Sequence, residues 1–258
     1  MISIKNPDQI EKMRKAGALL YEVLQKLREA VKPGMSTAAL DVYAEQLIRK
    51  NHAIPSFLNY CGYPASLCTS IDEQVVHGIP SETQILKEGS IISIDCGLVL
   101  DGWQADSAFT VGIGEISADA QALIEITEQC FWKGVRQAVA GNRLGDVGHA
   151  VQEWAESHGC GVIRDLTGHG IGREMHEDPT VYNFGDAGHG LRLRRGMTIA
   201  VEPMIAAGDW HVTEDPDGWC FRTRDGSLCS HYEHTIAIND SGLPEILTYP
   251  GFQWQEEE

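Results

Sequence analysis

The chain has 258 residues and a formal net charge of −17. This length allows one large core or two related halves, and no stretch approaches the ~20 apolar residues that a membrane helix needs, so no membrane partner is expected. An acidic surface repels phosphate backbones, which disfavours DNA as a partner and favours cationic ligands such as a metal ion or a free α-amino group.

The N-terminus has no long apolar run after a basic start, and the seven cysteines include no C-x-x-C pair. The first feature predicts that no signal peptide is present and that the protein is cytoplasmic. The odd number of cysteines, without metal-site spacing, predicts reduced thiols in place of a disulfide framework.

Two helices are expected at the start of the chain. Asn6 is suited to cap the first, Pro7 fits its first turn, and apolar residues follow at helical spacing until Lys32–Gly34 ends it. The second begins near Ser36 or Thr37 and runs to about Lys50.

After residue 115 the same order returns. Ser117 caps a helix that runs to about Val139, and after a break another helix runs from about Asp146 to His158. This repetition suggests two related halves, about 4–114 and 115–250, within a single catalytic domain that spans 1–258.

Acidic residues recur at matching points of the apolar strands expected in each half. Gly89–Asp95 and Gly196–Glu202 each run from a turn glycine through an apolar strand to an acid, at an offset of 107 residues. Asp106–Val111 and Glu233–Ile238 each open an apolar strand with an acid. A pseudo-two-fold relation between the halves would bring these four acids together.

Asp101-Gly102 is a strong signal for a two-residue hairpin loop. With that loop, Asp95 lies opposite Ala108. Asp106, two residues from Ala108, then shares a sheet face with Asp95, and diagonal neighbours of this kind lie roughly 7–8 Å apart. Both side chains can therefore reach one ion between them.

Four converging carboxylates need compensation. Two like charges ~4 Å apart repel by about 4 kcal/mol at an effective dielectric of 20, and clustered acids raise one another's pKa. Two divalent cations would neutralise the set. His169, flanked by glycines, is the expected imidazole ligand, and oxygen ligands with one imidazole suit Mn, Fe, Co or Zn.

The combined motifs resemble the methionine aminopeptidases of the bacterial type I kind, within the M24 metallopeptidase family. The resemblance extends from about Ile4 to Leu247 and implies an α/β "pita-bread" fold, in which two pseudo-two-fold related halves form a curved antiparallel sheet covered by helices. The motifs that carry it are Asp95-Cys96-Gly97, Asp101-Gly102, Asp106-Ser107-Ala108, Gly168-His169-Gly170-Ile171-Gly172, His176-Glu177, Glu202-Pro203-Met204 and Tyr232-Glu233-His234-Thr235.

The resemblance implies a centre of two divalent ions, drawn from Co, Mn, Fe and Zn. In it, Asp95 binds one ion, Asp106 and Glu233 bridge both, and His169 and Glu202 complete the second. Some relatives also hold a monovalent cation near the segments of Asp72 and Cys229. Asp72 departs from the usual Asn, so this ion stays open.

The implied reaction removes the initiator methionine from nascent proteins and peptides whose second residue is small. A water activated as hydroxide attacks the first peptide bond, Glu202 moves its proton, His176 stabilises the oxyanion, and His77 contacts the scissile amide. The expected substrate-binding residues are His77, His176, Tyr60, Tyr63, Cys68, Met175, Trp219 and Phe57. Met175 stands where an aromatic residue is usual and Phe57 where a small residue or Cys is common, so the pocket shape stays open.

Three alternatives compete with this function. They are a proline-specific aminopeptidase of the same fold, a non-catalytic peptide-binding module, and a two-metal phosphoesterase, which the −17 charge disfavours. The expected partner is the N-terminal Met of nascent peptides. A monomer is expected, and a transient ribosome contact is left open.

Overall fold

A computed structural model describes residues 2–240 and 242–255 of the protein. Its helices are α1 (Pro7–Ala30), α2 (Thr37–Lys50), η1 (Tyr60–Gly62, a 3-10 turn), α3 (Ala118–Arg136) and α4 (Leu144–Ser157). Its strands are β1 (Ile54–Pro55), β2 (Leu67–Ile71), β3 (Gln74–Val76), β4 (Ile91–Leu100), β5 (Trp103–Gly112), β6 (Gly161–Val162), β7 (Gly168–Gly170), β8 (Glu177–Val181), β9 (Thr198–Val201), β10 (Met204–Ala206), β11 (Val212–Glu214), β12 (Phe221–Thr223), β13 (Cys229–His231), β14 (Glu233–Ala237) and β15 (Glu245–Ile246).

The helix starts follow from capping. The Asn6 side chain accepts from the Gln9 N–H at 2.9 Å and the Gln9 side chain accepts from the Asn6 N–H at 2.9 Å, a complete capping box. Ser117 caps α3 as predicted, and Ser36 caps α2, which begins at Thr37 within the expected range. These contacts satisfy amide groups that the first turn leaves unpaired.

Two helix boundaries in the second half differ from the prediction. α3 ends at Arg136 and not near Val139, whose N–H bonds to the carbonyl of Gln137 instead of continuing the helix. α4 begins at Leu144, before the expected start, because the Asp146 carboxylate accepts from the Arg143 N–H at 2.7 Å and closes the first turn earlier.

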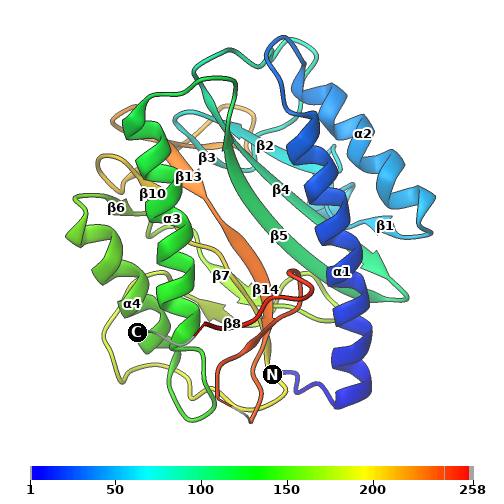
Figure 1. Cartoon of the computed structure of the whole chain (residues 1–258), viewed down its shortest axis with the longest axis vertical. Coiled ribbons are helices and arrows are strands. Elements are labelled where there is room, and N and C mark those ends of the chain that lie inside the picture. The colour runs from blue at the N-terminus through cyan, green and yellow to red at the C-terminus, as the bar shows by residue number, and fades with distance from the viewer. Residues whose placement is uncertain (1, 241, 256–258) are drawn as a thin grey trace.

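One nine-stranded antiparallel sheet forms the centre of the molecule (Figure 1). Its strand order is β1-β4-β5-β14-β9-β7-β8, with β2 also paired to β4 and β15 to β14. Two three-stranded sheets, β13-β10-β6 and β11-β12-β3, extend it. The central strand β14 comes from the C-terminal part of the chain and joins β5 to β9.

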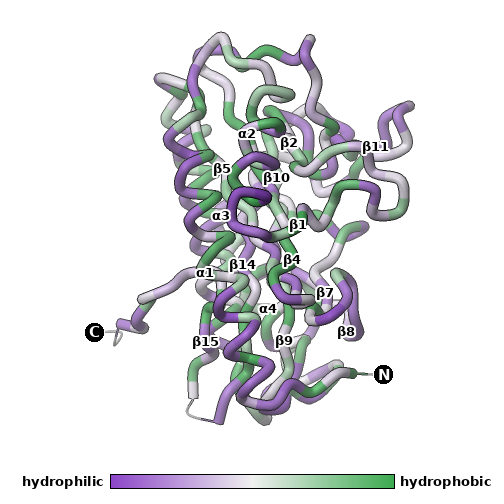
Figure 2. Tube along the Cα trace, turned by 90° about the vertical axis from the view of Figure 1, so that its right-hand side faces the viewer, coloured by the Kyte–Doolittle hydropathy of each residue, from purple (hydrophilic) through white to green (hydrophobic). Residues whose placement is uncertain are grey.

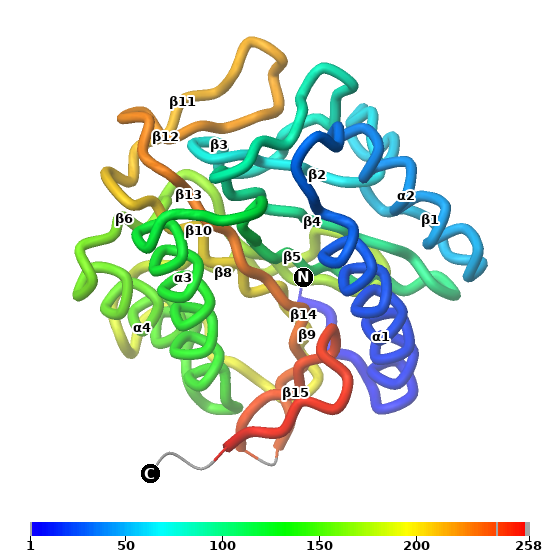
Figure 3. The backbone as a smooth tube through the Cα atoms, turned by 45° about the horizontal axis from the view of Figure 1, so that its top comes forward, coloured from blue at the N-terminus to red at the C-terminus, as the bar shows by residue number. Residues whose placement is uncertain are grey.

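The helices cover one side of this sheet (Figure 2), so the core lies between helices and strands. Viewed from another direction, the pair α1 and α2 and the pair α3 and α4 lie on either side of β14 (Figure 3). The first pair packs on β4 and β5 through an apolar cluster that includes Leu20, Leu27, Ile92 and Ile94. The mixed α/β class with antiparallel strands and covering helices is as predicted.

The β4–β5 hairpin has the register that the Asp101-Gly102 loop predicts. Leu100 pairs with Trp103, Asp95 with Ala108, and the pairing continues without interruption to Ile91 and Gly112. Asp101 and Gly102 have φ values of 51° and 76°, as a two-residue hairpin loop requires.

All seven cysteines are free thiols, as predicted. Among residues 2–240 and 242–255, no helix is long and apolar enough to cross a membrane.

Candidate metal centre and substrate pocket

Three carboxylates lie on one face of the central sheet. Ala108 pairs with Asp95 on one side and with Glu233 on the other, and directly paired residues point to the same face. Asp106 is two residues from Ala108 and therefore shares that face. A row across three strands thus gathers Asp95, Asp106 and Glu233, two of them from the first half of the chain and one from the second.

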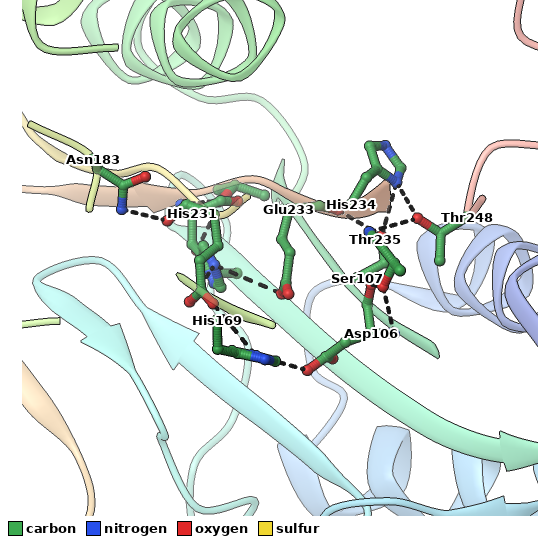
Figure 4. A network of polar contacts seen from close by, with 12 residues as sticks. Asp106, Ser107, His169, Asn183, His231, Glu233, His234, Thr235 and Thr248 are labelled. Atoms are coloured by element: carbon green, nitrogen blue, oxygen red, sulfur yellow. Dashed lines mark hydrogen bonds and ion pairs between the residues drawn. The ribbon is translucent and has the colours of Figure 1, made fainter. Parts of the chain in front are cut away.

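His169 and Glu202 complete the cluster. His169 of β7 pairs with Ala200 of β9, and Glu202 lies two residues beyond Ala200. The Nε2 atom of His169 lies 3.6 Å from Glu202 Oε1 and 3.7 Å from Asp106 Oδ2 (Figure 4). The Nδ1–H of His169 donates to the carbonyl of Gly170 at 2.8 Å, which leaves the Nε2 lone pair available to a metal.

The donor set fits a divalent metal ion. Ligand atoms of Asp106, His169 and Glu233 all lie within 4.8 Å of one another. Asp95 Oδ1, Asp106 Oδ1 and Glu233 Oε1 are buried and accept no hydrogen bond from the described residues. Buried carboxylate oxygens without donors are costly in a protein interior, and a cation would satisfy them.

Burial raises the pKa of all four carboxyl groups. The pKa of Asp106 rises to about 7, and that of Asp95 rises well above its usual range through burial and the charges of Asp106 and Glu202. Burial and the charge of Asp106 also raise the pKa values of Glu202 and Glu233. Burial lowers the pKa of His169 to about 3, so its imidazole is neutral. Without cations the cluster retains protons, as the sequence predicts for four close acids.

One pocket of about 370 Å³ adjoins this cluster. Each of the thirteen predicted site residues lines it: Phe57, Tyr60, Tyr63, Cys68, His77, Asp95, Asp106, His169, Met175, His176, Glu202, Trp219 and Glu233. The structure therefore brings the predicted ligands and the predicted substrate residues to the same cavity.

One end of the pocket is apolar and adjoins Asp95, because Cys68 pairs with Asp95 across the strands. Phe57, Tyr63, Cys68 and Met175 are buried in one cluster, against which Trp219 packs. The rings of Tyr63 and Trp219 meet edge to face at 5.1 Å between centroids. This end suits an unbranched apolar side chain of a substrate.

Two further histidines stand at the pocket. The Tyr60 hydroxyl lies 2.8 Å from His176 Nδ1, and the ring of His176 packs against His169 at 4.3 Å between centroids. Burial lowers the pKa of both His77 and His176, so both rings are neutral near pH 7. If the Tyr60 hydroxyl donates to Nδ1, the proton of His176 resides on Nε2, where it can be donated to another group.

His231 is close to the cluster although the sequence analysis did not single it out. It ends β13, is 1% exposed, and its Nε2 lies 3.8 Å from Glu202 Oε2 and 3.9 Å from Glu233 Oε2 (Figure 4). The sequence holds a signal for it, because strand alternation places His231 and Glu233 on one face if the extended chain continues through Tyr232.

His234 lies on the opposite face of β14, as expected for a neighbour of Glu233. Its Nδ1 lies 2.8 Å from the Thr248 hydroxyl and 3.0 Å from the Ser107 hydroxyl, and its Nε2 lies 3.1 Å from the Tyr232 hydroxyl. These contacts fix β14, the strand that carries Glu233, from the face opposite the carboxylates.

The fold and the donor set together define a metal-dependent hydrolase. A family model described as metallopeptidase family M24 matches residues 11–240 of this chain. The chain therefore belongs to the M24 metallopeptidase family.

Similar proteins indicate which kind of M24 metallopeptidase this chain resembles. A methionine aminopeptidase of Clostridium acetobutylicum is 55% identical over 248 residues, covering 96% of this chain and 99% of that protein. Methionine aminopeptidase 1 of Bacillus subtilis is 44% identical with the same coverage. The crystal structure of a methionine aminopeptidase from Thermotoga maritima superposes with a TM-score of 0.94 at 44% identity, covering 96% of this chain and 99% of that chain.

A solved Xaa-Pro dipeptidase from Bacillus anthracis has a TM-score of 0.76 at 21% identity and covers 97% of this chain but 63% of that chain. This likeness shows a shared fold alone. The architecture is thus the pita-bread fold of both groups of enzymes, as predicted.

Proposed function

We propose that this protein is a methionine aminopeptidase that removes the N-terminal methionine from peptides whose second residue is small. The observation that carries the proposal is the single pocket in which a buried carboxylate–imidazole cluster meets an apolar end. Two relatives named methionine aminopeptidase, which match this chain over nearly their whole length at 55% and 44% identity, support the same activity.

We infer that Asp95, Asp106, His169, Glu202 and Glu233 hold two divalent ions of Co, Mn, Fe or Zn. Two observations support this inference. Several buried carboxylate oxygens accept no hydrogen bond from the described residues, and the hydrogen bond from His169 Nδ1 leaves its Nε2 available as a metal ligand. Such ions, when bound, lower the pKa of a water and polarise a carbonyl. Asp106 and Glu233 sit between the other ligands and are suited to bridge the pair.

The chain's own residues supply the proton transfers. Glu202 is suited to accept the proton of the attacking water and to deliver it to the leaving amine, because its carboxylate borders both the cluster and the pocket. His176 is suited to donate from Nε2 to the oxygen of the attacked carbonyl when the Tyr60 hydroxyl donates to its Nδ1. His77, which lines the same pocket, is assigned to the scissile amide.

The apolar end would select methionine. Phe57, Tyr63 and Met175 line the space at this end. Phe57 and Met175 pack so closely on Gly97 that a Cβ there would lie 2.9 Å from each of them. A flexible, unbranched thioether suits such a space better than a branched side chain. The pairing of Phe57 with Met175 sets the shape of this end.

The setting of the reaction follows from the same features. We propose that the enzyme acts in the cytoplasm as a monomer on nascent chains. The acidic surface, at −17, supports a substrate with a free α-amino group and argues against nucleic acid as a partner.

The test is a substrate comparison with the metal-loaded protein. Met-Ala-Ser, an Xaa-Pro peptide and a phosphodiester are assayed with and without chelator. We expect cleavage of Met-Ala-Ser alone, abolished by chelation and restored by Mn²⁺ or Co²⁺. Asp106→Asn should lower the rate at least about 100-fold, whereas the exposed Asp8→Asn should not. Equal cleavage of the Xaa-Pro peptide would overturn the assignment.

A further inference from the structure

His231 is a buried imidazole without a hydrogen-bond partner at Nε2. It is 1% exposed, and Nε2 makes no hydrogen bond to the described residues. The carboxyl oxygens recorded near it are Glu202 Oε2 at 3.8 Å and Glu233 Oε2 at 3.9 Å. The nitrogen therefore points between two carboxyl groups of the proposed metal centre.

The main chain of His231 does not require an imidazole. The Thr110 hydroxyl donates to the His231 carbonyl at 2.9 Å and accepts from the His231 N–H at 3.0 Å, so the strand is held through backbone atoms. His231 also pairs with Met204 in the small sheet. An apolar side chain could satisfy these contacts, so packing alone does not explain a buried polar ring.

His231 shares a carboxyl neighbour with one of the expected ligands. Glu202 Oε1 lies 3.6 Å from His169 Nε2 and Glu202 Oε2 lies 3.8 Å from His231 Nε2, so the two imidazoles flank one carboxyl group. The three ligand atoms that lie within 4.8 Å of one another belong to Asp106, His169 and Glu233. His231 Nε2 instead faces the Oε2 atoms of Glu202 and Glu233.

We propose that His231 is a positioning residue of the metal centre, whose Nε2–H holds the Oε2 atoms of Glu202 and Glu233 and so fixes the orientation of the two carboxylates that would bind the ions. This inference rests on the proposed function. At 3.8 and 3.9 Å the contacts are longer than hydrogen bonds, and the Nε2–H would stabilise the carboxylates once they lose their protons on metal binding. Ionised carboxylates are acceptors only, and Nε2–H is the one state of the ring that complements them. Donors behind ligating carboxylates typically change metal affinity 10–100-fold when removed.

Two kinds of variant separate positioning from packing. His231→Gln keeps an N–H donor at similar reach, whereas His231→Leu and His231→Met remove the donor and fill the space. Titration calorimetry of the chelated full chain with Mn²⁺ measures the affinity of each site. We expect about 10–100-fold weaker binding at one site or both in the Leu and Met variants, and binding within about threefold of wild type for Gln. The kcat for Met-Ala-Ser should follow the same order with saturating metal, with KM little changed.

Thr110→Val is the matched control, because it disturbs the backbone support of His231 and leaves the imidazole. It should lower the unfolding midpoint of the metal-free protein and keep the Mn²⁺ affinity. Wild-type affinity in a folded Leu or Met variant, or equal losses in Gln and Leu, overturns the positioning role. Failure of both apolar variants to fold also overturns it, since the ring would then be required for packing. Failure of the wild type to bind Mn²⁺ or cleave Met-Ala-Ser would instead refute the proposed function.

Discussion

Lowering the pH should weaken metal binding through the carboxylates and not through the imidazole. In most sites with histidine ligands, the imidazole sets the loss of affinity near its usual pKa of ~6.5. Here burial lowers the pKa of His169 to about 3, so that ring is ready to bind across the neutral range. Asp106, by contrast, has its pKa raised to about 7 and holds a proton at mildly acidic pH.

The sign and size follow from proton competition. A metal-bound carboxylate must be deprotonated, so affinity falls as pH decreases through the raised pKa of the metal-free group. With Asp106 at about 7, removing its proton at pH ~6 costs about 1.4 kcal/mol, which is a tenfold loss of affinity relative to pH ~8. The raised pKa values of Asp95, Glu202 and Glu233 act in the same direction and steepen the dependence.

Calorimetric titration with Mn²⁺ at about pH 6 and pH 8, in two buffers of different ionisation enthalpy, measures both the affinity and the protons released. We expect at least about tenfold weaker binding at the lower pH and release of about one proton or more per protein. Asp106→Asn should release fewer protons. An affinity that is constant within a factor of about two, with no proton release, would refute the reasoning.

Three further changes test the surroundings of the site. Lys5→Met removes the ion-pair partner of the partly buried Glu177, 2.6 Å away, and should lower the free energy of unfolding by about 1.5–3 kcal/mol in urea titrations; a loss below about 0.5 kcal/mol would contradict a stabilising pair. Tyr60→Phe removes the contact to His176 and should lower kcat about 2- to 10-fold with KM nearly unchanged; unchanged kcat would show that the hydroxyl does not orient the ring. Gly97→Ala should crowd the apolar end of the pocket, destabilise the protein by about 1–3 kcal/mol and raise KM for Met-Ala-Ser; wild-type kinetics would mean that the pocket relaxes.

The relative position of Asp95 and Asp106 was predictable because a local sequence feature, the hairpin loop between them, determines it. A two-residue loop at Asp101-Gly102 determines the register of the whole hairpin, and the register determines which side chains share a face. Helix starts were predictable for a similar reason, because a capping side chain acts within three residues. The end of α3 was less predictable, since a helix end depends on the chain that packs after it.

The convergence of the two halves was inferred from repetition and from resemblance, not from local rules. The decisive pairing joins Ala108 to Glu233, residues far apart in the sequence, and no turn connects them. The position of His231 depends on two long-range pairings. Its own strand β13 pairs with β10, and the chain continues from β13 directly into β14, which pairs elsewhere. Long-range pairings of this kind are where sequence patterns carry least information.

Ala108 illustrates how the fold and the proposed chemistry depend on each other. It is 1% exposed and stands between Asp95 and Glu233 in one row of the sheet. The two acids beside it therefore point to the same face of the sheet. Asp106 and Glu233 are buried, so they lie in a medium where their charges repel strongly. The sheet that creates the site therefore makes it unfavourable without a counter-charge, and protons or divalent ions must supply that charge.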